Sequence, residues 1–259
     1  MPAFKLNMKK VILTPLFLFV CLNVWAWGAT GHRATGLIAE KYLTKKARKE
    51  LQRVLNGQSI AMAGTWMDDI RSDSTYDYAN DWHWVTILNG QTYEQSEKNP
   101  HGDVIQTLER LITELKTKKL SPKDEQEYVK MIIHLIGDIH QPLHVGINDQ
   151  GGNQVKVSWF RDDSNLHRVW DSDMIDGTKL SYTELAESLD KPDAVRVAAL
   201  QKSSVRDWAK ESISYRKQIY AYGNGKLGYK YAYLNMPIVR ERLLMGGVRL
   251  AGVLNEIYK

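Results

Sequence analysis

The pattern of apolar and polar positions predicts a chain of helices. Between Val104 and Lys118 apolar residues return every three or four positions, which places them on one stripe of a helix. Ser121 followed by Pro122 matches a helix start, and the segment from there to residue 139 is apolar on nearly every face, so we expect a buried helix. The same periodicity predicts further helices over residues 30–42, 44–55, 59–71, 165–174, 181–189, 195–222 and 237–258.

One segment alternates with the period of two that a strand requires. It runs from Gln154 to Phe160, after a turn at Gly151, Gly152 and Asn153, and it predicts half of a small β-hairpin, the only sheet we expect. The aromatic stretch 72–100 has no period and predicts irregular structure. The fold class is therefore all-α, in a single domain with a small β-hairpin.

The first 26 residues have the features of a secretory signal. Three lysines precede an apolar run over residues 11–22, which is too short to span a bilayer, and Ala26 offers a small residue for cleavage. A lipoprotein signal at Cys21 is the alternative, but Val20 is the wrong residue before such a cysteine. We expect cleavage after Ala26, one functional domain over 27–259, and a periplasmic or secreted protein that in its mature form has no membrane segment.

Removal of this signal changes the charge of the chain. Three lysines and no acid are lost, so the formal net charge falls from +5 to +2, which permits a nucleic-acid partner but does not argue for one. The chain has one cysteine, Cys21, and it lies in the signal. Any metal ion in the mature chain must therefore be held by histidine, carboxylate or backbone groups.

The segment from His134 to His144 concentrates metal-binding chemistry. His134 and Asp138 are four residues apart, so on a helix they share one face. Pro142 then ends or kinks the helix and lets His144 approach from the turn. Imidazole and carboxylate groups at this spacing are common zinc ligands.

A single histidine on an apolar helix is more often a hydrogen-bonded core residue than a ligand, so the rest of the chain has to decide. His167 and Asp171 repeat the spacing of four, and His32 lies five residues from the predicted mature N-terminus at Trp27. Cleavage would free the α-amine of Trp27, which is then an acceptable ligand. Two such pairs, with His144 beyond a proline, predict a multinuclear zinc site.

The order of motifs resembles that of the zinc-dependent single-strand nucleases of the S1/P1 type, which are relatives of zinc phospholipase C. The matching segments are WGATGH at 27–32, WMDDIR at 66–71, WHW at 82–84, HLIGDIHQPLH at 134–144, GGN at 151–153, NLHRVWD at 165–171 and GVRLAGVLNEI at 247–257. They cover essentially the whole mature chain, and together they are very specific. The resemblance implies the helical phospholipase C/nuclease fold and a nuclease domain over 27–259.

The resemblance also implies three zinc ions. The first would be held by Asp68, His83, His134 and Asp138. Its close neighbour would be held by the amine and carbonyl of Trp27, by His32 and by a bridging Asp138; the third, more exposed ion would be held by His144, His167 and Asp171. His101 and His140 fall outside the pattern, and we expect them at the surface or in a supporting role.

The implied activity is hydrolysis of single-stranded DNA and RNA to 5′-mononucleotides by a zinc-activated water, with 3′-nucleotidase activity, in a chain that we expect to be monomeric. Asp68, Arg71 and Asn153 would be the catalytic residues, the last two as phosphate clamps. For Arg71 the alternative is a surface ion pair with Asp69 or Asp73.

Single-strand preference would come from an unpaired base that stacks on an aromatic ring. Trp84 holds that position, with ordinary core packing as its alternative role. Thr86 stands where the fungal enzymes carry a base-reading aspartate, so the base preference is open. The rival activities are a zinc phospholipase C and a zinc-storage protein without catalysis; Asp171 and the short spacing from Trp27 to His32 favour the nuclease.

Overall fold

The structure is a computed structural model that describes residues 27–259, and it is built around one buried helix. This helix, α6 (Pro122–His140), begins at the predicted cap, where the Ser121 side chain accepts a hydrogen bond from the Asp124 amide. It contacts helices on all sides, and every residue from Met131 to His140 is buried. The predicted signal over 1–26 lies outside the described residues.

Helices supply most of the remaining structure, as the sequence predicts, so the all-α fold class is confirmed. Their bounds are α1 (Ala29–Lys41), α2 (Lys45–Val54), α3 (Ile60–Ala63), α4 (Trp66–Asp69), α5 (Val104–Thr117), α7 (Leu166–Arg168), α8 (Met174–Gly177), α9 (Tyr182–Glu187), α10 (Ala194–Lys202), α11 (Val205–Ser214), α12 (Arg216–Ile219) and α13 (Tyr229–Ile257). Short 3-10 turns cover η1 (Ile70–Ser72), η2 (Ser74–His83), η3 (Tyr93–Gln95) and η4 (Pro142–His144), and η5 (Val169–Asp173) is a π turn.

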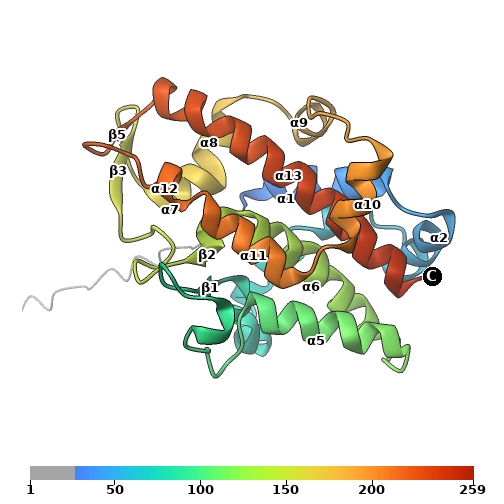
Figure 1. Cartoon of the computed structure of the whole chain (residues 1–259). Coiled ribbons are helices and arrows are strands. Elements are labelled where there is room, and N and C mark those ends of the chain that lie inside the picture. The colour runs from blue at the N-terminus through green and yellow to red at the C-terminus, as the bar shows by residue number, and fades with distance from the viewer. Residues whose placement is uncertain (1–26) are drawn as a thin grey trace, which may run out of the picture.

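The longest helix, α13, crosses the whole molecule and lies against α1, α10 and α6, while α5 covers the opposite side of α6 (Figure 1). Two hydrophobic clusters result. One is centred on α5, α6 and the C-terminal end of α13, and the other on α1, α8 and the rest of α13. The histidine-rich end of α6 lies where these clusters meet.

The sheet structure is larger than predicted. The expected hairpin is present as β3 (Lys156–Trp159) paired antiparallel with β4 (Asp162–Asn165). A third strand, β5 (Lys226–Leu227), adds to β3 in parallel, and β1 (Val85–Thr86) pairs in parallel with β2 (Val145–Gly146). Strands of two residues leave no alternation to detect, so the prediction of a single sheet was wrong.

Two predicted helix boundaries were also wrong. The helix over 195–222 is divided into α10, α11 and α12. Ser204 caps α11 and forms a capping box with Asp207, and Tyr215 separates α11 from α12. The helix expected to start at Pro237 starts eight residues earlier, at Tyr229. Pro237 removes one backbone hydrogen bond from the helix, but two buried side chains hold the helical turns that precede it. The Tyr231 hydroxyl donates to the Ile219 carbonyl, and the Asn235 amide donates to the Tyr231 carbonyl.

The predicted helix over 59–71 is broken at Gly64, which ends α3 before α4 begins. The break has a consequence for α6, because the Gly64 carbonyl accepts a hydrogen bond from His134 Nδ1 at 2.7 Å. Tertiary contact thus overrides helix periodicity at this point. Among residues 27–259, no helix is long and apolar enough to cross a membrane.

The crossing of α1 and α13 gives a first testable prediction. A Cβ at Gly247 would lie 2.5 Å from Ile38 Cβ, so Gly247→Ala must push the two helices apart. We expect a loss of about 1–3 kcal/mol in the free energy of unfolding, measured by chemical denaturation. Gly177→Ala in α8 meets nothing within 4 Å and is the matched control. Equal stability of the two variants would contradict the tight crossing.

Candidate metal centre

The centre is organised by two polar side chains on α6 that the surrounding helices bury completely. His134 and Asp138 are both 0% exposed and lie one helical turn apart, with His134 Nε2 3.3 Å from Asp138 Oδ2. The hydrogen bond to the Gly64 carbonyl occupies His134 Nδ1 and leaves Nε2 pointing at Asp138. A histidine and a carboxylate are thereby held together with no exposure to bulk solvent.

A first group of ligand atoms gathers beside this pair. Asp68, His83 and His134 each offer one nitrogen or oxygen, and these atoms lie within 4.8 Å of one another. His83 Nδ1 is 2.9 Å from Asp138 Oδ2 and 3.1 Å from His134 Nε2. The segment η2 ends at His83, and α4 carries Asp68. The four predicted ligands of the first ion are therefore brought together.

A second group forms on the other side of the pair, from His32, His134 and Asp138. The His32 ring is stacked on the His134 ring with centroids 3.9 Å apart, and its Nε2 is 3.3 Å from Asp138 Oδ1. Gly137 makes this approach possible, because a Cβ there would lie 2.7 Å from His32 Nδ1 and 3.8 Å from Trp27 Cδ1. Trp27 is buried against the same gap. Asp138 thus faces both groups.

The third group consists of His144, His167 and Asp171. His144 Nδ1 bonds to the His83 carbonyl at 2.7 Å, and His167 Nδ1 bonds to the Gly151 carbonyl at 2.6 Å. These bonds leave both Nε2 atoms directed at Asp171, at 3.8 and 2.9 Å. Asp171 lies in the π turn η5, a distortion that is frequent at functional sites.

The unpartnered atoms of the centre show that these residues fit a metal ion. Six buried side-chain atoms of these residues form no hydrogen bond, although some lie close to a carboxylate oxygen: His32 Nδ1 and Nε2, Asp68 Oδ1, Asp138 Oδ1, His144 Nε2 and His167 Nε2. A buried polar atom without a partner costs about 1–3 kcal/mol, so such a cluster is unusual unless cations satisfy it. A donor set of imidazoles and carboxylates suits zinc.

Burial and neighbouring charges set the protonation states. Burial lowers the pKa values of His32 and His83, which favours the neutral, metal-binding imidazole. Burial alone would lower the pKa of His134 as well, but Asp138 and Asp68 raise it to about 9. Although burial opposes ionisation of Asp138, His134 and the other histidines hold its pKa well below the usual range. A cation bound here would replace the proton that His134 shares with the carboxylate.

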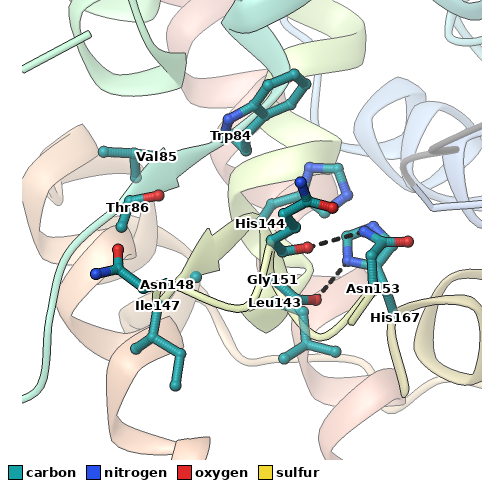
Figure 2. A pocket seen from close by; sticks show the side chains of 12 residues that line it. Trp84, Val85, Thr86, Leu143, His144, Ile147, Asn148, Gly151, Asn153 and His167 are labelled. Carbon is teal, nitrogen blue, oxygen red and sulfur yellow. Dashed lines mark hydrogen bonds between the residues drawn. The ribbon is translucent and has the colours of Figure 1, made fainter. Parts of the chain in front are cut away.

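The third group opens into a cleft of about 540 Å³ (Figure 2). His144, His167 and Asn153 lie at one side of this cleft, and Thr86 and Asn148 lie at the other. Trp84 is half-buried and lines the cleft, so it is not confined to core packing. Asn153 donates to the Gln150 carbonyl at 2.9 Å. Arg71 lies in η1, after the helix that carries Asp68, and does not line this cleft.

The two histidines outside the motif differ in their surroundings. His101 is exposed. His140 is completely buried on the face of α6 turned toward α13; its Nδ1 bonds to the Ile136 carbonyl and its Nε2 lies 3.0 Å from Arg249. Burial, with Arg242 and Arg249 nearby, holds the pKa of His140 well below its ordinary value. Both of its nitrogens are occupied, so it has none to offer a metal.

One residue that supports the third group, Gln141, was not predicted from the sequence. Gln141 is 0% exposed and donates its amide to Asp171 Oδ1 at 2.5 Å, while its oxygen accepts the Leu143 amide at 2.6 Å. It thereby orients Asp171, which lies 30 residues away in the chain. Nothing in the sequence around Gln141 indicates this role; the signal is the complete burial of its side chain, which only the fold shows.

Fold and site define a class: a helical protein with three groups of buried histidines and carboxylates that could bind metal ions, one of which opens into a cleft. The family model described as S1/P1 Nuclease matches residues 27–259, so the chain belongs to the S1/P1 nuclease family. It is a nuclease, and its substrates are nucleic acids.

Individual relatives agree with this assignment. Endonuclease 3 of Arabidopsis thaliana is 31% identical, over 97% of this chain and 96% of its own. Endonuclease 2 of the same plant is 27% identical over 98% of both chains. Nuclease S1 of Aspergillus oryzae is 25% identical over 58% of this chain and 55% of its own, and Nuclease P1 of Penicillium citrinum is 27% identical over 61% and 63%.

The role of Gln141 can be tested by metal titration. Gln141→Leu removes the bond to Asp171, and we expect zinc binding by the group of His144, His167 and Asp171 to weaken about 10–100-fold, with little change at the other two groups. The matched control is Gln126→Leu in α6, which removes a bond to the distant Val54 carbonyl. Calorimetric zinc titration distinguishes the two variants. Equal metal binding by Gln141→Leu and the parent chain would contradict the role.

Proposed function

We propose that this nuclease hydrolyses single-stranded DNA and RNA to 5′-mononucleotides and also removes 3′-phosphates from nucleotides, with three zinc ions as cofactors. The observation that supports this best is the set of buried histidine and carboxylate atoms that form no hydrogen bond, which belong to three groups of residues able to bind metal. Bound zinc would lower the pKa of a water to about 7 and neutralise charge on the phosphoryl oxygens. The residues of the chain would supply the other requirements of the reaction, which are to hold the ions and to bind and orient the substrate.

The proposed ligand sets follow the three groups. One ion would be held by Asp68, His83, His134 and Asp138. A second ion next to it would be held by the amine and carbonyl of Trp27, by His32 and by Asp138. The third ion would be held by His144, His167 and Asp171. Asp138 supports the bridging role because its two oxygens face different histidines, Oδ1 toward His32 and Oδ2 toward His83. The hydrogen bonds from ring Nδ1 atoms to backbone carbonyls would keep three of the imidazoles in place.

The substrate would be held by residues around the cleft. A base would stack on Trp84, beside Thr86, while Asn153 would donate to a phosphate oxygen near His144 and His167. Arg71, one turn beyond Asp68, would bind another phosphate oxygen. A base can enter a cleft of this kind only when it is unpaired, which accounts for the proposed single-strand preference.

Activity should depend completely on metal. After exhaustive chelation we expect release of acid-soluble nucleotides from single-stranded DNA to fall by at least about 100-fold, and zinc to restore it. The same preparations are assayed on a choline phospholipid as control. Full activity in the chelated protein, or lipid hydrolysis without nucleotide release, would refute the proposal. Three bound ions without any hydrolysis would point to metal storage.

The proposed amine ligand gives a separate test. A chain that begins at Trp27 should bind three zinc ions, whereas one extended by two residues before Trp27 should bind two and lose most activity, because its α-amine is blocked. Elemental analysis counts the ions. A matched tag after Lys259 is the control, since that end lies on the exposed surface. Three ions in the extended form would exclude the amine as a ligand.

A further inference from the structure

The lining of the cleft has no lysine, arginine or carboxylate side chain. Among residues 27–259, those that line it are Trp84, Val85, Thr86, Leu143, His144, Gly146, Ile147, Asn148, Gln150, Gly151, Asn153 and His167. The two histidines in this set, His144 and His167, belong to the third group. Away from these histidines, a molecule in the cleft therefore meets only neutral polar groups and apolar surface.

Thr86 and Asn148 provide free polar groups on the side of the cleft opposite His144 and His167 (Figure 2). Both are exposed, and within residues 27–259 neither side chain forms a hydrogen bond. Gln150 directly precedes Gly151, whose carbonyl binds His167, so its place in the chain is on the metal side. Thr86 and Asn148 are therefore the free polar side chains at the opposite edge.

The backbone holds these two residues at one edge. Thr86 of β1 is paired with Gly146 of β2, and Asn148 follows Gly146 by two residues. The next residue, Asp149, is held in turn, because its carboxylate accepts a hydrogen bond from the Tyr220 hydroxyl at 2.7 Å. Asn148 thus lies between two anchored points of the chain, and its amide stays beside Thr86.

A neutral amide at this edge can bind bases of different polarity. Each nucleic-acid base presents both donors and acceptors on its Watson–Crick edge, but the bases differ in their order. The carboxamide of Asn148 has two donors and one acceptor and can turn to match either order, and the Thr86 hydroxyl can donate or accept. A carboxylate here could only accept, and it would favour guanine, which presents two adjacent N–H groups.

We propose that Asn148, together with Thr86, binds the Watson–Crick edge of the base in the cleft, and that this site therefore accepts all four bases. The inference rests on the proposed function, because that function stacks the base on Trp84 and places its phosphate near His144 and His167. Stacking on Trp84 binds any base, and the contacts of Asn148 add affinity without selecting one of them.

The test measures binding to the zinc-loaded protein by calorimetry. The ligands are the four nucleoside 3′-methylenephosphonates, whose carbon–phosphorus bond resists hydrolysis, and the matching ribose compound without a base. In the parent protein we expect the dissociation constants of the four analogues to agree within about five-fold. The compound without a base should bind at least about ten-fold more weakly than any of them.

Two variants at one position test the edge contact. Asn148→Leu should weaken binding of all four analogues by about two- to ten-fold and leave the compound without a base within about two-fold of the parent value. Asn148→Asp should shift the ratio between bases, in favour of the guanine analogue over the other three by at least about five-fold. Asn56→Asp, which follows α2 and lies outside the cleft, is the control for added charge and should leave the ratio unchanged.

The other outcomes separate the inference from the proposed function. A larger preference of the parent for one base, equal binding of the compound without a base, or ratios that Asn148→Asp leaves unchanged would each overturn the inference while the proposed function stands. Hydrolysis of single-stranded DNA and of nucleoside 3′-monophosphates is assayed separately. If the analogues bind as expected but neither substrate is hydrolysed, the proposed function fails although the base contact holds. A parent protein that binds none of the analogues and hydrolyses neither substrate refutes both.

Discussion

The structure depends on the burial of a histidine and a carboxylate within an apolar helix. His134 and Asp138 lie at the meeting point of two hydrophobic clusters, where each would be costly without a partner. Their neighbours from α1, α4 and η2 supply further ligand atoms, and many of these have no protein partner either. The fold therefore buries a cluster of polar atoms that lack partners within the protein, and bound cations would satisfy them.

The irregular features of the fold serve this cluster. The break at Gly64 frees a carbonyl for His134, and the irregular connection at Gly151 provides one for His167. The π turn η5 carries Asp171, which Gln141 holds from the end of α6. At these three positions, departures from regular helix allow the backbone or an amide to orient a residue that could bind metal.

Around the centre, the connecting segments provide the substrate surface. The segment after His83 forms β1 and one edge of the cleft, and β2 after His144 pairs with it. Arg216 secures this pairing by donating to the carbonyls of Val145 and Gly146 at 2.7 and 2.9 Å. Because β1 begins two residues after His83 and β2 directly after His144, these two histidines and the paired strands at the edge of the cleft are held together.

Helical periodicity, caps and the spacing of histidines and carboxylates are local patterns, so the helical fold class, the buried helix and the residues able to bind metal can be predicted from the sequence. The two-residue strands, the start of α13 at Tyr229 and the division of the helix over 195–222 cannot. They depend on contacts such as the one between Tyr231 and Ile219, which join distant segments. His140 and His134 are likewise both histidines on one apolar helix, and the sequence does not show that the first lies against Arg249 while the second faces Asp138. That difference comes from the residues that the fold packs around each of them.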